Sequence, residues 1–184
     1  ANCVASDTII VGTPDTLFIA MDSIQICKGD TVNIAAIIPP NVNPDSLVWT
    51  QNGTAYGNGA TIQVWDNGTY CVNGTSLDGC PLVEACVVVE VIEPPVVAVN
   101  INSICTSGSI DLIANGFSPN CTSAQLYFQW YDANGPIADP TATTSNLVVA
   151  GSNYMAGDEL WVEVCCNGCC TISDTLIVQE GPQI

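Results

Sequence analysis

The chain has 184 residues, with one lysine, no arginine, no histidine and 18 acidic residues, which gives a formal net charge of −17. Nucleic acids and anionic membrane surfaces are bound by basic patches, so neither is an expected partner. Without histidine the chain lacks the usual general base, and without arginine it lacks a bidentate phosphate clamp. The acids stand mostly at turns and strand starts, where Asp is common. We therefore expect that the chain is not an enzyme. No apolar run is long enough to insert into a membrane.

The first predicted element is the strand Cys3–Val11, a β-branched apolar segment that leads into Gly12 and Pro14. A close copy, Cys170–Val178, precedes Pro182, and a looser copy, Cys86–Ile92, precedes Pro94. Strands bounded by breaker residues fit this pattern, since proline cannot continue a sheet ladder. If this unit is the closing strand of a domain, residues 1–14 are the closing strand of a preceding domain or a donated strand. Residues 15–94 and 95–184 are then two complete domains.

Residues 15–94 show strand periodicity and no helical period. Asn52-Gly53 indicates a hairpin turn after a strand that carries a core tryptophan, Trp49. Turn signals about every ten residues favour a β-sandwich. The predicted strands are Ser23–Cys27, Thr31–Ala35, Leu47–Thr50, Thr61–Trp65, Thr69–Val72 and Ala85–Ile92.

Residues 95–184 repeat this scheme. Ile104-Cys105 matches Ile26-Cys27, and Gln129-Trp130 with the following Asn134-Gly135 matches the first tryptophan strand and its turn. A self-similar period near 78 residues indicates an internal duplication. The sequence therefore predicts an all-β chain of two tandem immunoglobulin-like Greek-key β-sandwiches, stapled by disulfides and preceded by an extra N-terminal strand.

Four motifs within the first period carry a resemblance to a known group of proteins. They are Ile26-Cys-x-Gly-Asp-x-Val32, Val48-Trp-x-x-Asn-Gly53, Asn67-Gly-Thr-Tyr70 and Asp78-Gly-Cys80. Together they resemble the Ig-like and PKD-like repeats of secreted, cell-surface Bacteroidota proteins. The resemblance covers nearly the whole chain and implies an extracellular or cell-surface location. Such repeats occur in adhesins, in filaments and as spacers of secreted enzymes. The second repeat departs from the pattern at residues 165–170.

Eleven cysteines in a turn-rich chain indicate disulfides and an oxidising compartment. The predicted boundaries divide them as one, four and six, which leaves Cys3 to bond to a preceding domain or another subunit. The repeat pattern favours Cys27–Cys80, Cys105–Cys169 and a cross-strand Cys71–Cys86 bridge. Two further bridges of open pairing come from Cys121, Cys165, Cys166 and Cys170. The alternative is a thiolate metal cluster or a redox pair at residues 166–169, for which no neighbouring base lowers a thiol pKa. We expect no metal site in these cysteines.

Two kinds of glycosylation signal are present. Six of the twelve aspartates are followed by Ser or Thr and an aliphatic residue, which resembles the Bacteroidota O-glycosylation signal. The resemblance implies attachment at Thr8, Thr16, Ser23, Thr31, Ser46 and Thr175. The same triplet also arises where Asp ends a turn and a strand begins. N-glycosylation triplets stand at Asn52, Asn67, Asn73 and Asn120. These are less favoured, because Asn-Gly-Thr is also an ordinary hairpin turn.

Acids near the domain joints, namely Asp15, Glu93 and Glu180, offer the oxygen ligands that calcium prefers. The sequence has no dense Asp/Asn/Gly calcium loop, so no cofactor is predicted.

Two functions are compatible with these features. The first is a structural unit of an extracellular glycosylated filament or surface adhesin, which binds copies of itself or neighbouring repeats head-to-tail. Residues 4–11 would then add as a strand to a neighbour, and head-to-tail contacts build fibres rather than closed rings. The alternative is a carbohydrate- or ligand-binding module, or a spacer, of a secreted multidomain protein. The aromatic residues available for binding are Tyr56, Trp65, Tyr127, Tyr131 and Tyr154.

Overall fold

The computed structural model describes residues 16–181, which contain β-strands, turns and short 3-10 helices and no α-helix. No helix in this range is long and apolar enough to cross a membrane. The chain forms two compact units, the first running to Gln25 and over Thr31–Glu90. The second unit contains Val91 onward and also the short segment Ile26–Asp30. The predicted extra strand, residues 1–14, lies outside the described residues.

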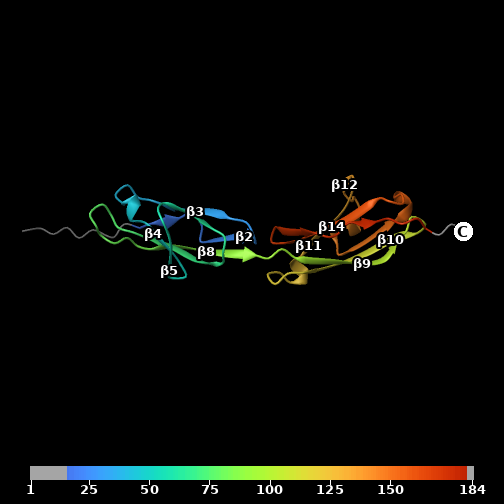
Figure 1. Ribbon diagram of the computed structural model, residues 1–184, viewed down its shortest axis with the longest axis horizontal. Helices are drawn as coiled ribbons and strands as arrows, with labels where there is room; N and C mark the ends of the chain where they lie inside the picture. The colour runs from blue at the N-terminus through green and yellow to red at the C-terminus, as the bar shows by residue number, and fades with distance from the viewer. Residues whose placement is uncertain (1–15, 182–184) are drawn as a thin grey trace, which may run out of the picture. The chain divides into compact units, whose positions relative to one another are not determined.

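The first unit is a sandwich of two sheets (Figure 1). Its three-stranded sheet has the order β1-β3-β6, with β1 at Phe18–Ile19, β3 at Val32–Ile37 and β6 at Thr61–Val64. Its five-stranded sheet has the order β2-β8-β7-β4-β5. These strands are β2 Ser23–Cys27, β8 Ala85–Ile92, β7 Gly68–Asn73, β4 Val48–Gln51 and β5 Thr54–Asn58. A 3-10 helix at Pro44–Ser46 connects the two sheets. The last residues of β2 and β8 belong to the second unit.

The second unit also contains two sheets. One has the order β13-β10-β9, with β13 at Asn146–Ala150, β10 at Ser109–Phe117 and β9 at Val96–Ile104. The other has the order β12-β11-β14-β15, and β16 also pairs with β14. Its strands are β12 Gly135–Pro136, β11 Tyr127–Asp132, β14 Glu159–Cys166, β15 Cys169–Ile172 and β16 Leu176–Ile177. Short 3-10 helices stand at Ser123–Gln125, Pro140–Thr143 and Gly151–Asn153.

A buried tryptophan lies at the centre of each core, because strand alternation places apolar side chains between the two sheets. Trp49 and Trp130 are fully buried, and their indole N–H groups donate to Gly59 O at 2.8 Å and Thr144 O at 3.0 Å. The core of the second unit draws on both sheets: Ile110, Leu112, Leu147, Trp130, Leu160 and Val162. The prediction of two all-β sandwiches is confirmed for residues 16–181.

Tight Asn-Gly turns set the register of the hairpins. Asn52 and Gly53 have φ of 50° and 81°, and Asn167 and Gly168 have φ of 49° and 84°. Two consecutive residues with positive φ form the type I′ turn that matches strand twist. The closing strand of the second unit is interrupted between β15 and β16, since the Ser173 hydroxyl accepts a hydrogen bond from Val162 N at 3.1 Å in place of a regular ladder contact.

Candidate functional site

Two disulfides join neighbouring strands at equivalent places in the two units. Cys71–Cys86 links β7 to β8, and Cys165–Cys170 links β14 to β15. In both pairs the residues are direct register partners with Cα atoms 4.0 Å apart. The Cys71–Cys86 pairing is the one that the sequence favoured. Each bridge ties the closing strand of a sandwich to the strand before it.

The two other disulfides lie in a small apolar cluster of the second unit. Cys121–Cys166 and Cys27–Cys169 surround the buried side chain of Ile92. The predicted pairs Cys27–Cys80 and Cys105–Cys169 are wrong, because Ile26–Asp30 belongs to the second unit and carries Cys27 to the start of β15. The free cysteines of the described residues are Cys80, which is exposed, and Cys105, which is partly buried. Cys3 lies outside those residues.

The predicted O-glycosylation positions differ in exposure. Ser23, Thr31 and Thr175 are exposed, Thr16 and Ser46 are partly buried, and Thr8 lies outside the described residues. Among the N-glycosylation triplets, Asn52, Asn67 and Asn73 are exposed and Asn120 is partly buried. The Oδ1 atoms of Asn52 and Asn120 accept backbone N–H groups from Thr69 and Glu93, both at 2.9 Å. Both amides therefore have a structural role in the folded chain.

Ser46 is expected to stabilise the first unit rather than carry a glycan. Its hydroxyl donates to Asn43 O (2.7 Å) and Thr75 O (3.1 Å) and accepts from Thr75 N (2.9 Å). Ser46→Ala leaves Thr75 N without this acceptor, so we expect a loss of about 1–3 kcal/mol in the free energy of unfolding. Denaturant unfolding measures this loss, with the exposed Ser23→Ala as the matched control. Equal stabilities for the two variants would contradict the assignment.

Residues 16–181 contain two groups of three potential metal ligands, and each group includes a disulfide. They are Cys71, Glu84 and Cys86, and Glu163, Cys165 and Cys170. Sulfurs in a disulfide are not thiolate ligands. Of the acids considered for calcium, Glu93 forms an ion pair with Lys28 at 2.7 Å, and Asp15 lies outside the described residues. Neither Glu93 nor Glu180 belongs to either group.

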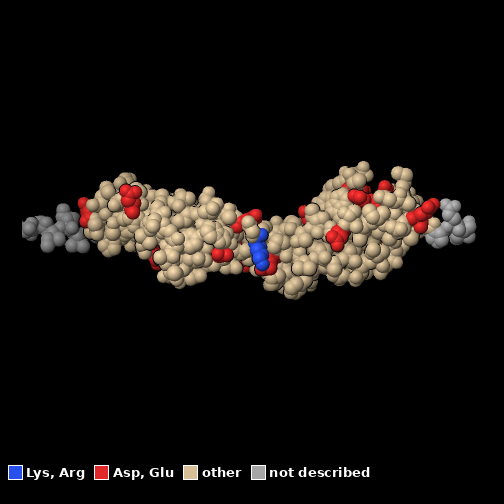
Figure 2. Space-filling view, in the orientation of Figure 1, with Lys and Arg blue, Asp and Glu red and all other residues tan. Residues whose placement is uncertain are grey.

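The carboxylates are spread across the surface. Figure 2 shows them scattered over the face in view instead of gathered in one patch. Lys28, the only basic side chain of the chain, has its charge compensated by Glu93. This distribution suits a strongly solvated surface more than an electrostatic docking site.

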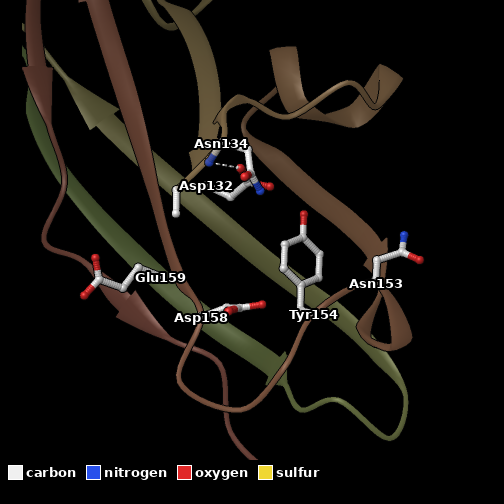
Figure 3. Close-up of a pocket in the computed structure, with 7 residues that line it drawn as sticks. Asp132, Asn134, Asn153, Tyr154, Asp158 and Glu159 are labelled. Carbon is white, nitrogen blue, oxygen red and sulfur yellow. Dashed lines mark hydrogen bonds between the residues drawn. The ribbon is translucent and has the colours of Figure 1, made fainter.

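A small acidic hollow of about 80 Å³, open to solvent, lies beside Tyr154 in the second unit. Asp132, Asn134, Asp158 and Glu159 line it, and in Figure 3 the carboxylate of Glu159 points away from the tyrosine. Asp132 and Asp158 accept backbone N–H groups at 2.7 and 2.8 Å, so both act as turn caps. Burial and the nearby aspartates raise the pKa of Tyr154. The hollow therefore holds a neutral phenol beside Asp132 and Asp158, whose carboxylates already have backbone partners.

Five aromatic residues make ring contacts within the described residues, three in the first unit and two in the second. In the first unit Tyr56 packs edge-on against buried Tyr70, with ring centroids 5.0 Å apart, and lies 6.1 Å from Trp65. Trp65 is 49% exposed. In the second unit Tyr131 stacks on Trp161 at 6.0 Å. Tyr127 and Tyr154 take part in neither cluster. Of the rings in these two clusters, Trp65 is the exposed one.

Tyr70 is expected to make the first unit sensitive to alkaline pH. Burial, followed by the neighbouring Tyr56 and Asp66, raises the pKa of Tyr70 to about 12. An unfolded tyrosine ionises near pH 10, so the native state keeps a proton that the unfolded state loses between about pH 10 and 12. The contribution of protonated Tyr70 to the free energy of unfolding should be fully present below about pH 10. It should be lost as the pH rises through this window. Tyrosinate absorbance and unfolding measured across it test this expectation.

Tyr70→Phe is the matched variant for the alkaline transition. It loses the 3.0 Å hydrogen bond from the phenol to Asp66 O. This loss should lower the free energy of unfolding by about 1 kcal/mol at neutral pH. It should also lose most of the additional decrease in stability above pH 10. An unchanged alkaline decrease in this variant would assign the effect to another group.

Comparisons with known proteins support the fold alone. No protein-family model matches the sequence, and no curated protein matches it. Among solved structures, the N-terminal eight Ig domains of Down Syndrome Cell Adhesion Molecule (DSCAM) isoform 1.30.30 align with a TM-score of 0.62 and 12% identity. That alignment covers 90% of this chain and 28% of the other. Murine CEACAM1b aligns at a TM-score of 0.46 and 14% identity, over 90% of this chain and 98% of its own. The fibronectin(III)-like modules of Clostridium thermocellum CbhA align at a TM-score of 0.48 and 14% identity, over 90% of this chain and 95% of the other. The likeness to the DSCAM domains identifies the fold of this chain as immunoglobulin-like.

Proposed function

We propose that this chain is a structural repeat unit of an extracellular, glycosylated filament or surface adhesin. In this proposal the units assemble head-to-tail through pairing of β-strands, and the chain has no enzymatic role. Four disulfides within residues 16–181 support an oxidising location outside the cytosol. The immunoglobulin-like fold agrees with such a role without identifying a partner.

One observation carries the proposal: the sequence contains three closing-strand segments, and residues 16–181 form two sandwiches. In the first unit β8 occupies the closing position, and in the second β15 and β16 do. The motif of Cys170–Val178 recurs at Cys3–Val11. Because both positions are already filled within the described residues, the additional copy suits a third sandwich. In a longer chain that sandwich is a neighbouring repeat, whereas between identical copies residues 4–11 add to an open sheet edge of the neighbour.

The cross-strand bridges suggest how such a strand would be fixed. Cys86 and Cys170, each in the closing strand of its unit, are bonded to the preceding strand. Cys3 has the same place in the motif as Cys170. In this proposal, where residues 4–11 close a neighbouring repeat, Cys3 bonds to the adjacent strand of that repeat as Cys170 bonds to Cys165. Exposed hydroxyls at Ser23, Thr31 and Thr175 are the preferred sites for glycans.

The proposal is tested by the concentration dependence of assembly. The intact chain should form oligomers whose mass grows with concentration in sedimentation experiments and which appear as linear arrays in electron micrographs. Ile9→Pro removes a donor and fixes φ within the strand motif, so it should abolish growth, whereas Ile9→Val should preserve it. A chain that stays monomeric at every concentration, with residues 3–11 cleaved readily by protease, would favour a spacer within a longer protein.

A binding role is the second candidate, and the exposed Trp65 favours it. Its ring lies beside Tyr56, whose hydroxyl is fixed by a 2.7 Å hydrogen bond to Gln63 O. Exposed, rigid aromatic rings suit stacking against sugars or other flat apolar faces. Carbohydrate-array binding that Trp65→Ala abolishes, with Tyr127→Ala unaffected, would establish this role. No binding by the intact chain would remove it.

A further inference from the structure

We infer that the two free cysteines form the covalent joint between successive copies of this chain, Cys105 of one copy to Cys80 of the next. The inference rests on the proposed head-to-tail assembly and specifies its chemistry. It comes from the disulfide Cys27–Cys169, which bonds a residue of the first sequence repeat to a residue of the second. Cys105 and Cys80 are the counterparts of these two cysteines, and both are free.

The first equivalence, between Cys27 and Cys105, is visible in the backbone as well as the sequence. Each cysteine follows an isoleucine, and the next residue donates its N–H to the end of the closing segment. Lys28 N donates to Ile92 O at 2.9 Å, and Thr106 N donates to Gln179 O at 3.1 Å. The two cysteines therefore occupy the same position relative to the strand that closes their own repeat.

The segment that carries Cys105 is held firmly. Gln179 N donates to Ile104 O at 2.8 Å, and Gly151 N donates to Gly108 O at 2.7 Å. A Cβ on Gly151 would collide with the carbonyl oxygen of Cys105, so this close approach requires glycine. Cys105 is thus presented on an ordered backbone.

The second equivalence, between Cys169 and Cys80, lies in the late hairpin of each unit. Both cysteines follow a glycine with positive φ, Gly168 at 84° and Gly79 at 81°. Each hairpin is anchored to the loop that precedes the tryptophan strand. In the second unit the anchor is Cys121–Cys166, and in the first it is the antiparallel bridge between Val42 and Ser76. Cys80 itself is exposed, with its N–H donated to Ser76 Oγ at 3.1 Å.

The polar contacts around Cys27–Cys169 have counterparts in sequence too. In the second unit Asn120 Oδ1 accepts the N–H of Glu93, and the Ser118 hydroxyl donates to Glu93 O at 3.1 Å. The pair Pro119-Asn120 recurs as Pro40-Asn41, and the acid before the linker proline recurs as Glu180. The chain thus has two equivalent early cysteines, Cys27 and Cys105, and two equivalent late-hairpin cysteines, Cys80 and Cys169. The described disulfide uses one copy of each.

The two free cysteines of the described residues stand in opposite repeats, Cys105 in the second and Cys80 in the first. One copy can therefore offer Cys105 while the next offers Cys80, and the same contact repeats without closing into a ring. Gln179 stands where Ile92 is buried in the described joint, so the joint between copies buries less apolar surface. The covalent bond therefore contributes a larger share of the stability of the joint between copies than Cys27–Cys169 contributes around Ile92.

The chemistry is a two-electron thiol–disulfide exchange with an external disulfide, such as oxidised glutathione. The Cys105 thiolate attacks one sulfur of the oxidant and releases one glutathione thiolate. The Cys80 thiolate of the next copy then attacks the Cys105 sulfur of the mixed disulfide and releases the second. Two protein thiols lose two protons and two electrons, and the oxidant is reduced to two thiols.

Two complementary single-thiol variants, both in a Cys3→Ser background, test the joint under oxidised glutathione. Cys80→Ser retains Cys105, and Cys105→Ser retains Cys80. We expect each variant alone to lack the cross-link and their mixture to give a dimer whose proteolytic map contains the Cys105–Cys80 peptide. The Cys3→Ser chain with both thiols should form a covalent ladder. A mixture without this dimer, or one joined only through Cys105–Cys105 or Cys80–Cys80, would overturn the inference.

Two further measurements separate this inference from the proposed function. If the chain with Cys3 intact joins Cys105 to Cys3 in preference to Cys80, the joint is misassigned although assembly stands. If Cys80→Ser/Cys105→Ser still forms linear arrays in electron micrographs while the single-thiol mixture gives no cross-link, strand pairing holds and the covalent joint fails. Arrays from the double variant together with the Cys105–Cys80 peptide from the mixture support both.

Discussion

Replacing Trp130 by alanine is expected to destabilise the second unit by about 3–5 kcal/mol, the usual cost of deleting a fully buried large aromatic side chain. The ring is completely buried among Ile110, Leu112 and Leu147 of one sheet and Leu160 and Val162 of the other. Its removal leaves a cavity that these neighbours only partly fill. The change also leaves Thr144 O without the indole N–H that it accepts at 3.0 Å.

Hydrogen exchange measured strand by strand is the appropriate readout, because it reports the stability of each unit separately. Protection should fall in β10, β11 and β14 and remain unchanged in β4 and β7 of the first unit. Trp161→Ala is the matched control. Its ring is only partly buried and stacks on Tyr131, so its loss should cost about 1 kcal/mol. Equal effects of the two substitutions would mean that Trp130 is not the centre of the core.

Much of this fold is predictable from local sequence, because strand alternation and turn chemistry act over a few residues. The alternation in Thr61–Trp65 predicts β6, whose residues alternate between exposed and buried. The pair Asn52-Gly53 predicts a hairpin, and both residues have the positive φ that the turn requires. Trp49 was expected in the core and is fully buried. Each prediction depends on a preference that neighbouring residues are sufficient to express.

The disulfide partners of Cys27 and Cys169 could not be predicted in the same way. A duplicated sequence identifies Cys27 with Cys105 and Cys80 with Cys169, yet both Cys27–Cys80 and Cys27–Cys169 agree with that alignment. In the second pairing the partner of Cys27 lies one repeat further along the chain than in the first. The choice depends on which unit contains Ile26–Asp30, and that is set by long-range packing around Ile92. Local preference carries no information about it.

The acidic hollow at Tyr154 shows a related limit. Asp132, Asp139 and Asp158 stand in three separate turns and look like ordinary turn residues, which they also are. Their common effect on the pKa of Tyr154 arises only when β11, the 3-10 helix Pro140–Thr143 and the turn before β14 come together. Sequence pattern predicts each turn but does not predict that they surround one phenol.

Removing the Cys27–Cys169 disulfide with Cys27→Ser/Cys169→Ser is expected to have the second large effect. Cross-links stabilise mainly by restricting the unfolded chain, with a typical contribution of about 2–4 kcal/mol that grows with loop length. This bridge spans 142 residues, whereas Cys71–Cys86 spans 15. The variant should therefore lose more stability than Cys71→Ser/Cys86→Ser, with the loss confined to the second unit and the control's loss confined to the first. It should also lose hydrogen-exchange protection at Lys28 N, which pairs with Ile92 O. If Lys28 remained protected, backbone pairing alone would hold Ile26–Asp30 in the second unit, and the bridge would not be what fixes that segment there.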